Sequence, residues 1–164
     1  MTARIPVTLR VLAVVWAILS VFATIDVHSA AEDVRITIPA SVNFAVTNAS
    51  VATTGSPAAG TVSFNQLNVV SGHVLRISIK ADGDFVPPSG TAIPASRVSW
   101  TTSGASNGTG SSGTLSTSIY SPLFLAGASK KSGSVNVTWS LAAPGTGIRA
   151  GTHRLTVRWK LESF

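Results

Sequence analysis

Cysteine is absent from the 164-residue chain, and charged residues make up only 11% of it. Without cysteine, a fold of this size cannot use disulfide bonds and must be stabilised by packing and strand pairing. Apolar periodicity of the helical kind, with capping residues at its ends, is also missing from Glu32 onward. The sequence therefore argues against disulfide-rich and helical fold classes, and its length suffices for one core after the first residues are set aside.

Groups that could perform acid–base or nucleophilic chemistry are scarce as well. From Glu32 onward the histidines are His73 and His153, and neither has metal-ligand spacing to the other or to a run of carboxylates. For no serine can a histidine with a nearby acid be nominated as its base. The Asp82-Gly83-Asp84 triplet offers oxygens to a calcium ion, but it lacks the longer loop of a specific site and is first a turn signal. We therefore predict a protein that is not an enzyme and that has no metal or cofactor.

Residues 1–31 have the character of a targeting signal. Arg4 and Arg10 precede the apolar run Val11–Ile25, and Ser29-Ala30-Ala31 supplies the small residues that a signal peptidase reads. The apolar run is shorter than the roughly 20 residues that a membrane-spanning helix needs. We predict a cleaved signal peptide and a protein secreted to the cell surface, with no stable membrane span after cleavage. The alternatives are an earlier cleavage site and an uncleaved anchor.

Alternating apolar rows, separated by Gly, Pro, Ser, Thr and Asn, recur over residues 32–164. A period of two is typical of strands with one buried face. The early rows are Val34, Ile36 and Ile38; Val42, Phe44 and Val46; Val62, Phe64 and Leu67; Leu75, Ile77 and Ile79; and Val98 and Trp100. This spacing predicts an all-β fold, a single immunoglobulin-like antiparallel β-sandwich over residues 32–164.

Between these rows, Thr101 to Thr114 contains hardly an apolar side chain, which predicts a mobile surface loop. After it, Ile119, Leu123 and Phe124 are expected in the core, with Tyr120 at its edge.

The stretch Val135–Leu161 contains the two clearest predicted strands, and the rest of the fold is expected to be arranged around them. In the first strand Val135, Val137, Trp139 and Leu141 alternate with polar residues, and in the second, which begins at His153, Leu155, Val157, Trp159 and Leu161 do the same. Each apolar row ends in the triplet Trp-x-Leu, a flat anchor followed by an aliphatic one. Because the tryptophans stand inside alternating rows, we expect them in the core; the alternative is an exposed platform for sugar rings.

These triplets resemble the WxL domain, a surface module of Gram-positive bacteria. The resemblance rests on Trp139-Ser140-Leu141 with Ala143-Pro144 behind it, on the approach from Ala150 to Arg158, and on Trp159-Lys160-Leu161. It implies non-covalent attachment to the cell wall through peptidoglycan. The motif residues that it carries over are Trp139, Leu141, Trp159 and Leu161.

The charges from Glu32 onward lean basic, which favours an anionic partner such as a wall glycopolymer. Secretion argues against nucleic acid. Arg154, Arg158 and Lys160 share one side of the last strand, at a spacing of roughly 7 to 14 Å that could follow a repeating polymer. The alternative is an edge strand protected by charge against pairing with other chains.

A second hypothesis gives the protein a different class of function, as a subunit of an extracellular filament or surface layer. Val34–Ile38 directly follows the predicted cleavage site and carries alternating branched residues ahead of Pro39. Such a segment could complete the sheet of a neighbouring copy. The alternative is that it pairs within its own sheet.

Overall fold

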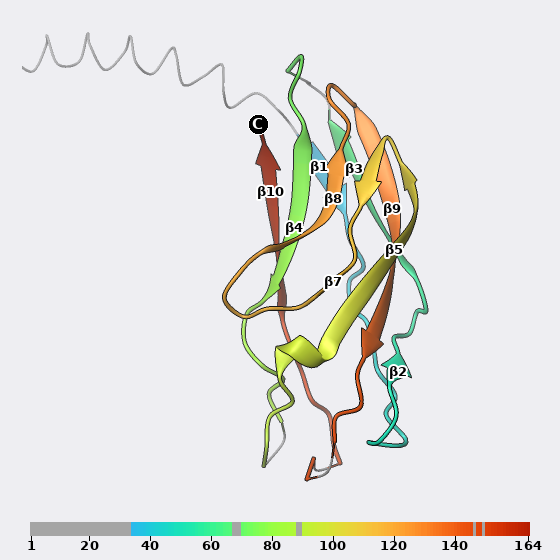
Figure 1. Ribbon diagram of the computed structural model, residues 1–164, viewed down its shortest axis with the longest axis vertical. Helices are drawn as coiled ribbons and strands as arrows, with labels where there is room; N and C mark the ends of the chain where they lie inside the picture. The colour runs from blue at the N-terminus through green and yellow to red at the C-terminus, as the bar shows by residue number, and fades with distance from the viewer. Residues whose placement is uncertain (1–33, 67–69, 88–89, 146, 149) are drawn as a thin grey trace, which may run out of the picture. The chain divides into compact units, whose positions relative to one another are not determined.

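The computed structural model describes residues 34–66, 70–87, 90–145, 147–148 and 150–164 (Figure 1). Within these residues the chain forms two antiparallel sheets. The first has the strand order β1-β3-β9-β5-β7, and β2 also pairs with β9. Its strands are β1 (Val34–Thr37), β2 (Thr53–Thr54), β3 (Gly60–Gln66), β5 (Val98–Ser106), β7 (Gly113–Thr114) and β9 (Ser132–Leu141).

The second sheet is four-stranded, with the order β10-β4-β8-β6. Its strands are β4 (Leu75–Ala81), β6 (Gly108–Gly110), β8 (Ser121–Ala126) and β10 (Val157–Ser163), and the short 3-10 helix η1 (Ala95–Arg97) leads into β5. The inward side chains of the two sheets form one continuous core, which includes Trp100, Phe124, Leu75, Ile77 and Val137. The β-sandwich predicted from the sequence is confirmed, and its immunoglobulin-like character stays a prediction.

The two lateral sides of the sandwich differ. On the side of β5, β6, β7 and β8, the sheets are tied together: Ser111 N donates to Leu123 O at 2.8 Å, and Trp100 Nε1 donates to Ser111 O at 2.7 Å. On the other side lie the two end strands β1 and β10. The half-buried apolar side chains that pack against the core come largely from this second side, and they include Val34, Ile36, Val157, Trp159 and Leu161.

The sequence prediction of a mobile loop from Thr101 to Thr114 is wrong. β5 continues to Ser106, and β6 and β7 lie within the same stretch (Figure 1). Polar side chains do not prevent a strand when the backbone finds a partner, and here β9 pairs with β5 along most of its length. Glycine also fits the tight packing: a Cβ on Gly110 would lie 2.7 Å from Thr102 Oγ1, and one on Gly113 would lie 2.6 Å from Trp100 Cζ2.

Three smaller predictions also need correction. The row Val42–Val46 forms no strand, and its only described pairing is an isolated bridge between Asn43 and Ser56. Ile119 is 65% exposed rather than part of the core, because it precedes β8 instead of lying in it. The last strand begins at Val157, not at His153, since Arg154 pairs only in an isolated bridge with Val86. Residue 67 and the predicted signal peptide lie outside the described residues.

Candidate functional site

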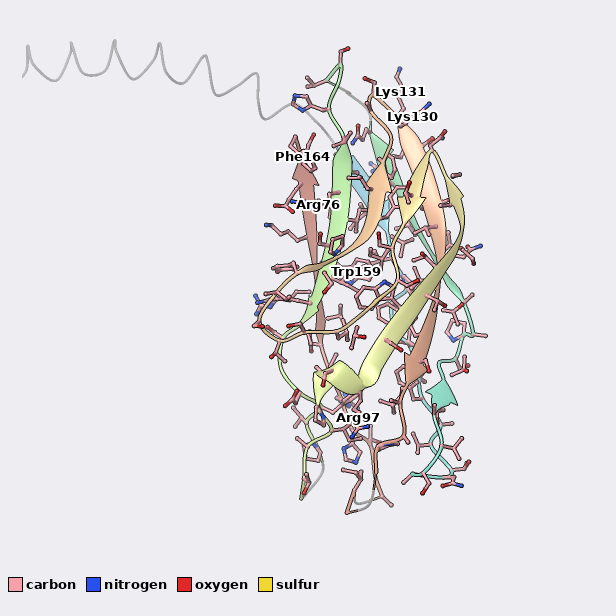
Figure 2. The ribbon with its side chains drawn as sticks, in the orientation of Figure 1. Arg76, Arg97, Lys130, Lys131, Trp159 and Phe164 are labelled. Atoms are coloured by element: carbon pink, nitrogen blue, oxygen red, sulfur yellow. The ribbon has the colours of Figure 1, made fainter. Side chains whose placement is uncertain are left out.

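The motif tryptophans occupy different environments. Trp139, in β9, is 5% exposed and lies opposite Trp100 of β5, with ring centroids 5.9 Å apart and an interplanar angle of 50°. Leu141 is 2% exposed. Trp159 (Figure 2) and Leu161, in β10, are only half-buried and pack against the same core from the other sheet. The two triplets therefore shape the core and its margin, and Trp139 and Leu141 cannot reach a ligand without unfolding.

Polar side chains gather on the outer face of β4 and β10. The register places Arg158 beside Lys80, Lys160 beside Ser78, and Glu162 beside Arg76, so these side chains leave the sheet on the same side. We call Arg76, Lys80, Arg158 and Lys160, with the carboxylates Asp82 and Glu162, the basic face. The period-two pattern of the last strand predicts two of its cations, Arg158 and Lys160. Arg76 and Lys80 could have been added, because they alternate with Leu75, Ile77 and Ile79.

Two carboxylates organise the basic face. Asp82 accepts two hydrogen bonds from Arg158, from Nε to Oδ1 at 2.5 Å and from Nη2 to Oδ2 at 3.0 Å. This arrangement lowers the pKa of Asp82, chiefly through the hydrogen bond from Arg158, and raises the pKa of Arg158. Two of the donor groups of Arg158 are therefore occupied by Asp82.

Glu162 lies between two other cations. Its Oε1 is 2.6 Å from Lys160 Nζ, and its Oε2 is 2.9 Å from Arg76 Nη2. The hydrogen bond from Lys160 and then that from Arg76 lower the pKa of Glu162. With four cations against these two carboxylates, the basic face keeps a formal charge of +2 (4 − 2) when all six groups are ionised.

Aromatic rings are interleaved with these cations. Tyr120 lies with its ring centroid 5.3 Å from Lys80 Nζ and 5.6 Å from Lys160 Nζ. Phe164 lies 4.9 Å from Arg76 Cζ, and Figure 2 shows both residues near the C-terminal end of β10. Tyr120 is 36% exposed and Phe164 is 56% exposed, so both rings remain partly accessible. The face thus combines excess positive charge with flat apolar surface.

Arg154, the third cation of the sequence prediction, lies before β10. Its backbone pairs with Val86, with Val86 N donating to Arg154 O at 2.7 Å, and its side chain is exposed. The structure therefore keeps Arg158 and Lys160 on one strand face and places Arg154 at the start of the approach to that strand.

The described residues contain no group of three or more His, Asp or Glu side chains that could hold a metal ion. In the proposed turn, Asp82 pairs with Arg158, and Asp84 Oδ1 accepts a hydrogen bond from Ala95 N at 2.8 Å. Both carboxylates thus have structural partners. In the same described part of the chain, no helix is long and apolar enough to span a bilayer.

Comparison with known proteins adds no relative. No family model, no curated protein and no solved structure matches the chain.

Proposed function

We propose that the protein is a non-enzymatic surface protein that attaches non-covalently to the bacterial cell wall, and that the basic face binds an anionic wall polymer. The observation that carries this proposal is the concentration of four cations and two partly accessible rings on one face of a rigid sheet. The WxL-like triplets Trp139-Ser140-Leu141 and Trp159-Lys160-Leu161 and the signal-like N-terminus are consistent with it.

The ligand class follows from the chemistry of the face. Lysines attract phosphate or carboxylate groups as point charges. Lys80 on β4 and Lys160 on β10 lie diagonally across the strand pair, since Lys80 faces Arg158 and Lys160 faces Ser78. An exposed ring such as Tyr120 offers an apolar surface on which a sugar ring can lie. Together they suit a polymer in which sugars alternate with negative charges, such as peptidoglycan bearing an anionic glycopolymer.

The test is a pull-down of the purified protein on isolated Gram-positive walls, with and without their anionic polymers, across a salt series. Exposed charges interact over a Debye length of about 8 to 10 Å near physiological ionic strength, so binding should weaken as salt rises. Replacement of Arg154, Arg158 and Lys160 by serine should reduce binding. The Arg158→Ser change also leaves Asp82 without its ionic partner, which complicates the reading of this triple variant.

A sharper variant is Lys80→Ser with Lys160→Ser. It removes two ammonium groups and the Lys160–Glu162 ion pair, while the Arg158–Asp82 and Arg76–Glu162 pairs stay in place. We expect affinity for intact walls to fall about ten- to thirtyfold, because an exposed charge contact at about 4 Å contributes on the order of 1 kcal/mol.

The matched control is Lys130→Ser with Lys131→Ser, which removes the same charge from exposed positions between β8 and β9. Figure 2 shows these two lysines at one end of the sandwich. If the control variant loses as much binding as the Lys80 and Lys160 variant, net charge rather than the basic face determines attachment. If the parent ignores walls at low salt, wall binding itself is wrong.

The filament hypothesis stays as the second candidate. Its donor segment, Val34–Ile38, overlaps β1, which pairs in register with β3 from Val34↔Gln66 to Thr37↔Ser63. Donation to a neighbour would therefore require β1 to leave β3. Deletion of residues 32–39 followed by gel filtration tests this: an assembly that persists without the segment contradicts strand donation.

A further inference from the structure

β10 is the end strand of its sheet, so some of its backbone N–H and C=O groups point toward β4 and the others point away from it. Val74 N donates to Phe164 O at 2.9 Å and Phe164 N donates to Val74 O at 3.2 Å, so these two residues form a hydrogen-bonded pair. In an antiparallel ladder such pairs recur at every second residue, and the residues between them direct N–H and C=O away from the partner. The residues directed away from β4 are Val157, Trp159, Leu161 and Ser163.

The same residues leave the core incompletely covered. Trp159 and Leu161 point inward and pack against the core, yet they are only half-buried, whereas Ile77 and Ile79 beside them on β4 are 0% exposed. Among the described residues, the backbone groups of β10 that have no strand partner and its partly exposed apolar side chains therefore lie along one edge. A strand added at this edge would hydrogen-bond with the backbone groups and would cover the apolar side chains.

The charges of β10 are complementary to those of a second β10 in an antiparallel register centred on Leu161. With Leu161 opposite Leu161 of a second copy, Lys160 lies opposite Glu162 of that copy, and Glu162 lies opposite its Lys160. When one strand is shifted by two residues, Arg158 lies opposite Glu162 of the second copy, but Lys160 then lies opposite Lys160 of that copy. Cross-strand pairs of opposite charge stabilise a sheet and like charges directly opposite destabilise it, so we expect the register about Leu161, which has no like-charged pair, to be favoured.

We propose that β10 is a homodimer interface, in which β10 strands of two copies pair antiparallel about Leu161 and join the two four-stranded sheets into one. A two-fold axis through this pair is perpendicular to the sheet, so the outer faces of both copies look the same way. The charged side chains that would guard the edge against other strands, Lys160 and Glu162, here select a second copy. This inference does not depend on wall binding.

Cysteine cross-linking tests the register. The chain has no cysteine, so Leu161→Cys introduces a single thiol. Opposed residues of a hydrogen-bonded pair have Cα atoms about 5.5 Å apart, within the range that a disulfide spans. We expect the Leu161→Cys protein to form a covalent dimer under mild oxidation. The protein is expressed from the full sequence and used after any processing by the producing cell. Thr109→Cys, exposed on the opposite end strand β6, should remain largely monomeric.

Charge reversal tests the interface without any covalent bond. Lys160→Glu places a carboxylate opposite Glu162 of the second copy, and Glu162→Lys places an ammonium group opposite Lys160 of that copy. By sedimentation, each variant alone should dimerise at least about tenfold more weakly than the parent. An equimolar mixture of the two should restore dimerisation, because both cross-strand pairs are then of opposite charge.

A circular dichroism melt of each variant first establishes that it folds. Glu162→Lys removes the carboxylate that Arg76 contacts. If this variant does not fold, the dimerisation of Lys160→Glu and the cross-linking of Leu161→Cys test the interface. Three outcomes would overturn the proposal: a parent protein that is monomeric up to submillimolar concentration, cross-linking at Thr109→Cys as efficient as at Leu161→Cys, or mixed charge variants that stay as weakly associated as each alone.

Discussion

Replacing Trp139 with alanine would remove one of the two buried tryptophans of the first sheet. Trp139 is 5% exposed, and its ring packs at 5.9 Å from that of Trp100, so little of the vacated space opens to solvent. Buried aromatic-to-alanine changes cost about 3 to 5 kcal/mol, through lost transfer free energy and the cavity left behind. For a domain of this size, that loss corresponds to a fall in Tm of roughly 10 to 20 °C.

Trp159→Ala provides the matched comparison. Trp159 has the same chemistry but is only half-buried on β10, so its replacement should cost about half as much, roughly 1.5 to 2.5 kcal/mol. Urea denaturation followed by far-ultraviolet circular dichroism measures both free energies of unfolding. Equal losses for the two variants, or a loss below about 2 kcal/mol for Trp139→Ala, would contradict the burial argument. Wall binding by the Trp139 variant should fall in parallel with its folded fraction.

Two further predictions concern packing and charge. Gly113→Ala should destabilise the protein by about 1 to 3 kcal/mol, because its Cβ would lie 2.6 Å from Trp100 Cζ2, whereas Gly83→Ala, with nothing within 4 Å, should change the free energy of unfolding little; urea midpoints compare them. Since the hydrogen bond from Arg158 lowers the pKa of Asp82 in the folded protein, its stabilising contribution is present above the unfolded pKa near 4 and is lost as the pH falls through the lower, folded pKa. Urea midpoints measured from about pH 6 to pH 3 should therefore fall further for the parent than for Asp82→Asn, and parallel curves would exclude the contribution.

The sequence predicted strands best where one face is apolar and the other polar. Residues 75–81 and 135–141 show this pattern, and both are central strands with their apolar residues in the core. The pattern failed for strands that consist of polar or small residues. Gly108–Gly110 and Gly113–Thr114 have no alternation of apolar and polar side chains, so their sequence does not reveal them. They are defined by pairing with β8 and β5 and by the close approach of Thr102 and Trp100.

The basic face shows the same division. The period-two alternation places Arg158 and Lys160 on one side of a strand, and it does the same for Arg76 and Lys80 on another. The sequence does not reveal that these strands are neighbours, because β4 and β10 pair across a long separation along the chain. Nor does it predict that Glu162 bridges Arg76 and Lys160, or that Tyr120, from outside both strands, lies near two lysines.

By itself, the sequence determined the all-β class, the inward rows of the main strands and the scarcity of catalytic groups, because each of these depends on residue type and local period alone. Tertiary structure decided which rows share a sheet, how deeply each motif tryptophan is buried and which of the described strands ends each sheet. Sheet pairing is a contact between distant segments, and its register is set by the combined burial and hydrogen bonding of both strands. The half-buried Trp159 and the buried Trp139 each begin a Trp-x-Leu triplet, and only the position of β10 at the end of its sheet separates their roles.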